Sequence, residues 1–351
     1  MSGAARVLEY DWDFHGHRHV VASLERMIVQ DKLAQTLLLH GPEGIGKATL
    51  ARRLASRLLD DRTRIEQDDL SRESNLQLVA DREKWTAEKR NEDPLLFASL
   101  SDFVTFAPDG PLRQISIPQM RLLKERAQYQ PLKGRRRVFL IDRIDRANEQ
   151  AANSLLKTLE EPPGHMIFVL TAENAYDLLP TIRSRSLQMA MHPLSTDDMA
   201  AFLKTRPKLD QLERRLVLAG GRPGVALSLD LEVYDKRRTA MLALLKVASR
   251  QAPFATWLKF SETISASKSE KLEFYLQVLY GLLEDVLVLR HGGKRLQNPD
   301  LQPDLAAMAA AVSFRWIQVA VKEVDQMADY IRRNIQKGIA LDALVVRLQA
   351  L

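Results

Sequence analysis

Residues 36–55 read TLLLHGPEGIGKATLARRLA, and this stretch decides the fold. Its apolar opening, Thr36–Leu39, has the length of a buried strand, and the leucines after residue 48 recur at helical spacing. A glycine-rich turn joins the two patterns. Strand, glycine loop and helix together predict the first unit of an α/β domain with a P-loop.

The turn at 41–48, GPEGIGKA, has the spacing of a phosphate-binding P-loop. In such a loop, backbone N–H groups and a helix N-terminus hold the phosphates, and a lysine neutralises their charge. The residues that match are Gly41, Gly44, Gly46 and Lys47. Ala48 stands where a Ser or Thr hydroxyl would ligate Mg²⁺, so we expect a vestigial phosphate loop. An ordinary glycine-rich turn with an incidental lysine is the alternative.

A second buried strand, Val138–Ile141, leads into Asp142 and Arg143. A domain that hydrolyses ATP needs an aspartate near the metal and a glutamate that orients the attacking water. Asp142 is retained as a vestigial acidic site, but Arg143 is a cation and cannot act as a general base. Together with Ala48, this predicts that ATP binding is possible but that the chain does not hydrolyse ATP, so we expect no intrinsic catalysis.

Buried strands separated by helices predict a parallel sheet that is covered on both faces. Ile167–Leu170 is the third expected strand, and Ser116 with Gln119 forms a capping box before a helix that runs to about residue 128. Residues 60–110 are dense in charge and predict surface loops and short helices. Beyond residue 192 we expect helices alone, because the strand patterns stop there.

Composition restricts where the protein works. Cysteine is absent from the 351 residues, so disulfides and thiolate metal sites are excluded and a cytoplasmic location is favoured. No apolar stretch has the length of a membrane span. The net charge of +6 is compatible with nucleic-acid contact, but 51 basic residues stand against 45 acidic ones, so charge alone decides nothing.

Two segments, 153-NSLLKTLEEPP-163 and 178-LLPTIRSR-185, resemble the AAA+ clamp-loader subunits of bacterial DNA polymerase III. Together with the P-loop stretch, the resemblance covers roughly residues 10–60 and 115–230. It implies an AAA+ P-loop domain at 1–192 with an insertion at 60–110, a small helical lid domain at 193–236, and an all-α collar domain at 237–351. The zinc module that many relatives carry in the insertion cannot form without cysteine.

The degraded nucleotide site favours the delta-prime branch of this family over the gamma/tau branch, and Gly224 aligns with the sensor arginine of the ATPase members. The family's Ser-Arg-Cys element remains as Ser184, Arg185 and Ser186. The resemblance implies that Arg185, with Ser184 in the same motif, is an arginine finger that reaches toward the γ-phosphate of ATP on a neighbouring subunit. Arg183 is the rival finger, and a surface salt bridge is the alternative role for Arg185.

The function implied by the resemblance is that of a non-hydrolysing subunit in a hetero-pentameric clamp loader of the DNA polymerase III holoenzyme. Its partners would be the delta and gamma/tau subunits and, through the complex, the beta sliding clamp and primer–template DNA, with no membrane contact. No cofactor, zinc or other metal would be required. Two alternatives stay open: an ATP-hydrolysing gamma/tau-type subunit, and a nucleotide-binding AAA+ adaptor outside replication.

Three further groups of residues invite a functional interpretation. His15, His17 and His19 alternate, but they lack a suitably spaced acidic partner and so favour a solvated turn over a metal site. The basic run at 133–137 could contact phosphates or simply lead into the buried strand. The last apolar stripe predicts helix packing and consists of Leu341, Leu344, Val345 and Leu348.

Overall fold

The computed structural model describes residues 10–267, 271–331 and 336–351, so the first nine residues of the predicted 1–192 domain lie outside it. The chain divides into two compact units between Ser228 and Leu229. The predicted boundary at 236/237 falls inside α12 (Leu231–Ala248). An uninterrupted helix leaves no linker at that point, and the units instead divide at the turn before α12.

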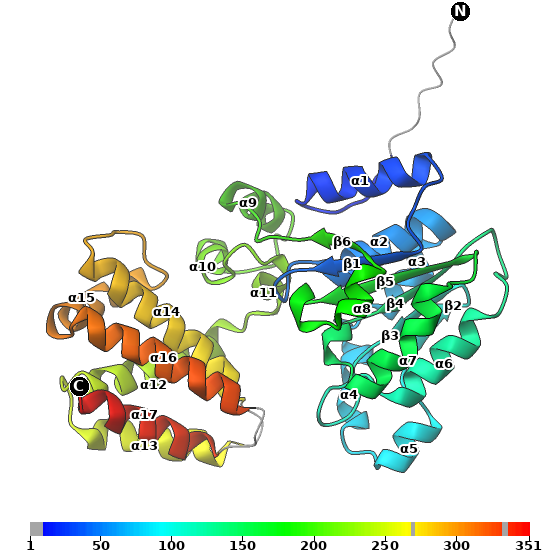
Figure 1. Ribbon diagram of the computed structural model, residues 1–351. Coiled ribbons are helices and arrows are strands. Elements are labelled where there is room, and N and C mark those ends of the chain that lie inside the picture. The colour runs from blue at the N-terminus through cyan, green and yellow to red at the C-terminus, as the bar shows by residue number, and fades with distance from the viewer. Residues whose placement is uncertain (1–9, 268–270, 332–335) are drawn as a thin grey trace, which may run out of the picture. The chain divides into compact units, whose positions relative to one another are not determined.

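A six-stranded sheet forms the centre of the N-terminal unit, in the order β2-β3-β4-β5-β1-β6 (Figure 1). The strands are β1 (Thr36–His40), β2 (Phe97–Leu100), β3 (Phe103–Phe106), β4 (Arg137–Ile141), β5 (Met166–Ala172) and β6 (Leu187–Ala190). Neighbouring strands are parallel except for β2 and β3, which pair antiparallel. The predicted parallel sheet is therefore confirmed, but β2, β3 and β6 were not predicted, and β2 pairs antiparallel with β3.

Helices connect these strands and continue beyond the last of them. The helices of the N-terminal unit are α1 (Arg18–Val29), α2 (Lys47–Leu59), α3 (Arg62–Ile65), α4 (Glu73–Arg82), α5 (Ala87–Glu92), α6 (Ile117–Ala127), α7 (Glu149–Glu160), α8 (Pro180–Ser184), α9 (Thr196–Lys204), α10 (Leu212–Leu218) and α11 (Pro223–Ser228). Short 3-10 turns lie at Glu66–Asp68, Ile144–Arg146 and Ala175–Asp177. The predicted capping box at the start of α6 is confirmed, because Ser116 and Gln119 bond to each other's backbone.

Successive side chains of the central strands point to opposite faces of the sheet, so apolar residues on both faces need helices to cover them. Leu37 and Leu39 of β1 belong to the core beneath α1 and α2, whereas Leu38 belongs to the opposite core. That second core also contains buried side chains of α6, α7 and α8. Every residue of β4 and β5 is buried, which is why these strands show continuous apolar runs in the sequence.

The expectation of loops and short helices at 60–110 is only partly correct. Helices α3, α4 and α5 lie there, but residues 97–100 and 103–106 form strands, and all of β3 is buried. Four residues are too few to show a clear period among so many charges. The buried guanidinium of Arg82 joins separate parts of this region, 2.8 Å from Asp109 and 3.2 Å from Asp93.

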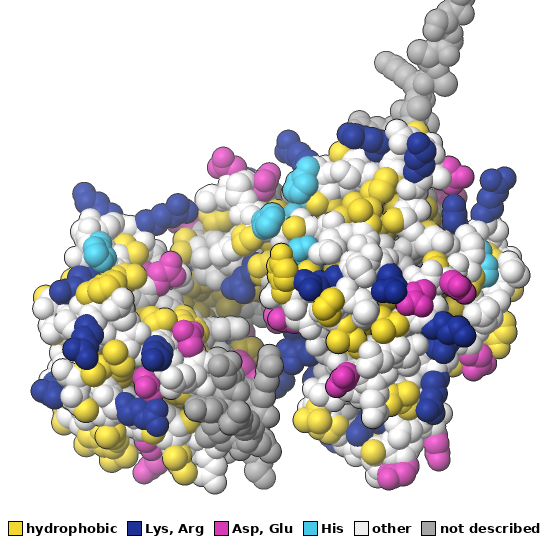
Figure 2. All heavy atoms as spheres, in the orientation of Figure 1, with side chains coloured by type: hydrophobic (Ala, Val, Ile, Leu, Met, Phe, Trp, Pro, Cys, Tyr) yellow, Lys and Arg dark blue, Asp and Glu magenta, His cyan; other side chains and the backbone are white. Residues whose placement is uncertain are grey.

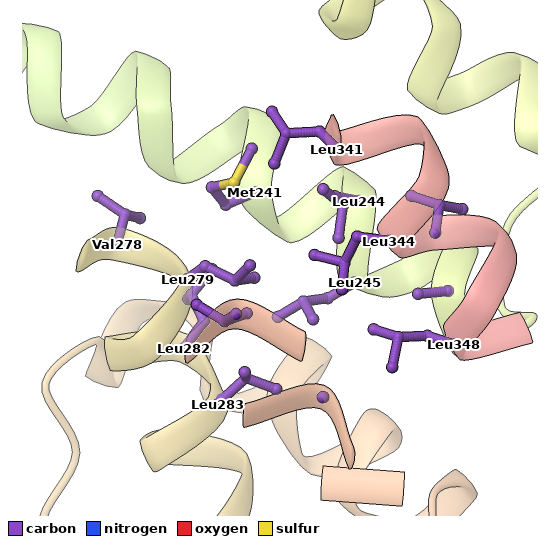
Figure 3. Close-up of a cluster of buried hydrophobic side chains, with 14 of the residues drawn as sticks. Met241, Leu244, Leu245, Val278, Leu279, Leu282, Leu283, Leu341, Leu344 and Leu348 are labelled. Atoms are coloured by element: carbon purple, nitrogen blue, oxygen red, sulfur yellow. The ribbon is translucent and has the colours of Figure 1, made fainter. Parts of the chain in front are cut away.

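The described residues of the C-terminal unit form helices and the turns that connect them, with no strand among them. Its helices are α12, α13 (Phe254–Ala266), α14 (Leu272–Arg290), α15 (Gln302–Ala311), α16 (Phe314–Ile331) and α17 (Lys337–Gln349), with a 3-10 turn at Pro299–Leu301. Figure 3 shows Leu341, Leu344 and Leu348 of α17 among the leucines of α12 and α14. The prediction that this stripe packs against other helices is confirmed.

Among the described residues, no single helix is both long and apolar enough to cross a membrane. One bent pair, Pro299–Ala311 with Phe314–Met327, meets the length and composition only in combination, with an angle of 110° at the break. Both parts supply buried side chains to the core of the C-terminal unit, including Leu305 and Trp316. Their place in this core accounts for their apolar composition.

Leu344→Ala should lower the free energy of unfolding by about 2–5 kcal/mol, because Leu344 is 2% exposed and its truncation leaves a cavity in the helical core. Val346→Ala is the matched control on the same helix. Val346 is 57% exposed, so its truncation should change stability by less than about 0.5 kcal/mol. Urea denaturation compares the two variants, and equal effects would contradict the packing role of the stripe.

Candidate functional site

The P-loop joins β1 to α2 at the carboxyl end of the parallel strands, where sheets of this kind bind ligands. Gly46 is the N-cap residue of α2, and Lys47 is its first residue. The Lys47 ammonium donates hydrogen bonds to the carbonyl oxygens of Gly41 at 2.6 Å and Pro42 at 2.9 Å. Burial lowers the pKa of Lys47, and the nearby carboxylate of Glu173 opposes that shift. The lysine is thus held by the loop itself.

Helix α11 packs directly on the P-loop through two glycines. The backbone N–H of Gly224 donates to the carbonyl oxygen of Gly44 at 2.7 Å. Gly44 has a φ of +78°, and a Cβ on it would lie 2.7 Å from a methyl carbon of Val225. A Cβ on Gly224 would in turn lie 3.0 Å from the Gly44 carbonyl oxygen. Sequence reasoning treated Gly224 only as the place of a missing arginine and did not find this contact.

Few of the groups that hold Mg²⁺ in a P-loop protein remain at this site. Ala48 is half-buried and packs against the apolar core beneath α1 and α2, so a methyl group takes the place of the metal-binding hydroxyl. Asp142 follows β4 and accepts a hydrogen bond of 2.6 Å from the hydroxyl of Thr171. The same hydroxyl accepts the backbone N–H of Arg143 at 2.8 Å. Thr171 therefore ties the ends of β4 and β5 together.

Arg143 places a fixed positive charge in this site. Its backbone is left-handed, with a φ of 56°, and its guanidinium pairs with Glu43 of the P-loop at 3.1 Å and with Glu173 after β5 at 2.5 Å. Burial alone lowers the pKa of Arg143, but the two carboxylates outweigh it and raise the pKa. Sequence reasoning named Arg143 and missed both glutamates. Their positions near the carboxyl ends of β1 and β5 were the available signal.

Arg185 lies at the end of α8, and its bonding partners lie in α7 and α8 rather than in the P-loop. Its guanidinium pairs with Glu160 of α7 at 2.6 Å and donates to the carbonyl oxygen of Thr181 at 3.0 Å and the hydroxyl of Ser184 at 3.3 Å. Within the part of the chain that the structure describes, these partners all belong to α7 and α8. The predicted site residues therefore form two groups, the P-loop with Asp142 and the α8 pair Ser184 and Arg185.

Arg183 is held differently from Arg185. Its guanidinium lies 5.0 Å from the centre of the Tyr176 ring, a cation–π distance. The segment is helical up to Ser184 and not extended. Residues two apart on a helix are separated by roughly 200° around its axis, so the two arginines still point to different sides.

The basic run at 133–137 is exposed at Lys133 and Arg135, half-buried at Arg136 and buried at Arg137. Arg137 is 6% exposed, and its guanidinium donates to backbone carbonyls of Arg126, Tyr129 and Ser101 at 2.6–3.1 Å. The Arg137 guanidinium therefore stabilises the fold by joining the end of α6 to the segment before β3. Basic and acidic side chains are interspersed on the face of the molecule that Figure 2 shows.

The expected solvated turn is wrong for His17, which is 7% exposed. His17 and His19, two of the three alternating histidines, border an open pocket of about 480 Å³ together with the first turn of α9. His17, His19, His192 and Asp198 line it. No group of three His, Cys, Asp or Glu side chains among the described residues is placed to hold a metal ion. Burial lowers the pKa of His17, and the neighbouring His19 lowers it further.

Comparison with known proteins identifies the family. A family model described as "DNA polymerase III, delta subunit" matches residues 16–195, just over half of the chain. The chain belongs to the DNA polymerase III clamp-loader family. The matched segment contains the P-loop, Asp142 and the α8 arginines of this clamp-loader protein.

Relatives of this clamp-loader protein carry two subunit names. The delta' subunit of Escherichia coli K12 is 26% identical over 253 residues, which are 71% of this chain and 74% of that subunit. The gamma subunit of Buchnera aphidicola from Acyrthosiphon pisum is 31% identical over 196 residues, which are 56% of this chain and 49% of that subunit. The chain thus spans about half the length of this gamma relative.

Among solved structures, a gamma subunit-related protein from Thermotoga maritima is similar, with a TM-score of 0.46 and 17% identity, over 93% of this chain and 98% of that one.

Gly44→Ala should lower the free energy of unfolding by about 1–3 kcal/mol, because alanine is strained at this positive φ and its Cβ meets Val225. Gly164→Ala is the matched control, since a Cβ there meets nothing within 4 Å. We expect the control to stay within about 0.5 kcal/mol of the unsubstituted chain in urea denaturation. A tolerated Gly44→Ala would show that α11 is not packed on the loop in solution.

The depressed pKa of His17 predicts a loss of stability in mild acid. Below about pH 6.5, the ordinary pKa of histidine, the unfolded chain takes up a proton at His17 that the folded chain resists. Folding stability should therefore fall as the pH is lowered from 6.5 toward the lower folded pKa. Urea midpoints between pH 5 and pH 7.5 measure this slope, and His17→Gln should flatten it. An unchanged slope in the variant would rule out His17 as its source.

Proposed function

We propose that the chain is a delta-prime-type subunit of a bacterial clamp loader that does not hydrolyse ATP and that donates Arg185 to a neighbouring ATPase subunit. The ion pairs of Arg143 are the observation that carries the first half of this proposal. A cation held between Glu43 and Glu173 takes the position next to Asp142 where catalysis requires a glutamate base.

The residues present do not fit a productive Mg²⁺–nucleotide complex. Ala48 offers a methyl group instead of a hydroxyl ligand, and the ammonium of Lys47 is hydrogen-bonded to loop carbonyls. Helix α11 contacts the loop at Gly44 without any arginine at residue 224. Each of these features removes or redirects a group that positions metal, phosphate or water, so turnover by this chain is not expected.

The extent of the sequence matches supports the delta-prime role over the gamma/tau role. The alignment to the Escherichia coli delta' subunit covers about three quarters of that relative, whereas the gamma alignment covers about half of its relative. Replacement of the catalytic groups in this chain points the same way. The proposed partners are the delta and gamma/tau subunits and, through the complex, the beta sliding clamp and primer–template DNA in the cytoplasm.

Arg185 is the proposed finger because its partners are replaceable. The side chain of Arg185 is 32% exposed and that of Glu160 is 46% exposed, so water already competes for the pair. A phosphate offers more negative charge and accepts a guanidinium through two parallel hydrogen bonds. Arg183 is the weaker candidate, because its guanidinium already stacks on Tyr176.

Arg185→Ala in a reconstituted loader should reduce ATP turnover stimulated by clamp and primed DNA. The ATP site that Arg185 serves should hydrolyse ATP about 10³-fold or more slowly. The total ATP turnover of the loader should therefore fall by the fraction that this site contributes. Arg183→Ala is the comparison and should have a much smaller effect. Full turnover with Arg185→Ala, or a larger loss with Arg183→Ala, would contradict the assignment of the finger.

ATP turnover by the purified chain separates this proposal from a gamma/tau-type ATPase. A delta-prime-type subunit should give no turnover above background, whereas a gamma/tau-type subunit hydrolyses ATP alone. A chain in which Lys47 is replaced by Ala serves as the control for contaminating ATPases. Turnover that disappears in this control would overturn the non-hydrolysing assignment.

A further inference from the structure

We propose that Glu160 is a positioning residue that holds the Arg185 guanidinium back against its own subunit until a neighbouring phosphate displaces it. This inference rests on the proposed role of Arg185 as a finger. It assigns a second residue to that role and predicts the sign of its effect. Glu160 restrains Arg185, so loss of the Glu160 carboxylate should make Arg185 more available to a phosphate.

The bonding of Arg185 is that of a retracted side chain. One guanidinium nitrogen meets Glu160 at 2.6 Å, and another donates to the Thr181 carbonyl oxygen at 3.0 Å and the Ser184 hydroxyl at 3.3 Å. These partners lie at the end of α7 and within α8 itself. The carboxyl end of a helix carries partial negative charge, which also favours a cation folded back onto α8. To reach a phosphate on another subunit, the guanidinium must exchange these partners.

Glu160 is fixed in place by the local sequence, although its side chain is exposed. It is the last residue of α7, and Pro162 and Pro163 follow closely and prevent the helix from continuing. The backbone of Glu160 is therefore positioned by the packed helix, while its carboxylate stays in water. An ion pair of this kind contributes little to stability but can still bias the position of a long side chain.

Arg185 must break its ion pair with Glu160 before it can bind a phosphate, and this costs free energy only when Arg185 acts as a finger. Exposed ion pairs change an equilibrium by about two- to fivefold, which sets the size of the restraint. Since Glu160 competes with the phosphate for the same guanidinium, loss of its charge should favour engagement of Arg185 by that factor. Unstimulated turnover should respond most, because clamp and DNA already promote engagement in the stimulated complex.

The isolated chain provides a test that does not depend on activity. Phenylglyoxal modifies accessible arginines, and mass spectrometry gives the rate at each position. In Glu160→Gln, modification of Arg185 should be about two- to fivefold faster than in the unsubstituted chain. Glu161→Gln is the matched control, because it removes the same charge from the next residue, which forms no ion pair with any described residue. Equal rates at Arg185 in all three chains would overturn the proposal.

The reconstituted loader provides the second test. Glu160→Gln should raise unstimulated ATP turnover by between about 1.3- and threefold, since other ATP sites contribute unchanged turnover to the total. The increase should vanish when Arg185→Ala is added, and Glu161→Gln should leave turnover unchanged. A decrease, no change, or an increase that persists with Arg185→Ala would each overturn the restraining role of Glu160.

The same set of variants distinguishes the two proposals. If Arg185→Ala alone has no effect on stimulated turnover, the finger itself is wrong and the role of Glu160 falls with it. If Arg185→Ala lowers turnover and Glu160→Gln changes neither turnover nor modification, only the restraint is wrong.

Discussion

The Arg143 guanidinium lies where three parts of the N-terminal unit meet. It reaches the P-loop through Glu43 and the end of β5 through Glu173, while its own backbone follows β4. Without a cation between them, the two carboxylates would repel each other across the site. Arginine suits this position because it stays charged and presents donors in more than one direction. The two ion pairs of Arg143 thus connect the P-loop to the ends of β4 and β5.

The strand order explains why so few residues control this site. Strands β4, β5 and β1 are adjacent and parallel, so their carboxyl ends lie side by side. Asp142, Thr171 and the P-loop each stand near one of these ends. A single residue at each strand end therefore belongs to one shared site, and replacing one or two of them changes the chemistry without disturbing the buried strands.

Hydrolysis and arginine donation place different demands on a protein. Hydrolysis needs metal, lysine and base to converge on one phosphate, and the proposed loss of hydrolysis depends on Ala48 and Arg143, which replace two of these groups. A finger needs only a guanidinium on a fixed helix end that can exchange its partners, and in the proposed function Arg185 at the end of α8 has this role. A subunit can therefore lose the first activity and still serve a neighbour, which is the basis of the proposed function. Glu160 adds a means of controlling when that arginine is available.

The sequence by itself determined β1, β4, β5 and the helices around them, along with the loss of a metal-binding hydroxyl at Ala48. Strand and helix periods depend on neighbouring residues, so these features are local. Residues 97–106 were not predicted as strands, because β2 shows no alternation between buried and exposed residues and β3 follows a segment that is dense in charge. The tertiary structure alone decided the contact between Gly44 and Gly224, the two carboxylate partners of Arg143, and the pairing of Arg185 with Glu160. These contacts join residues distant in the chain, and only the packing of whole helices and strands brings such residues together.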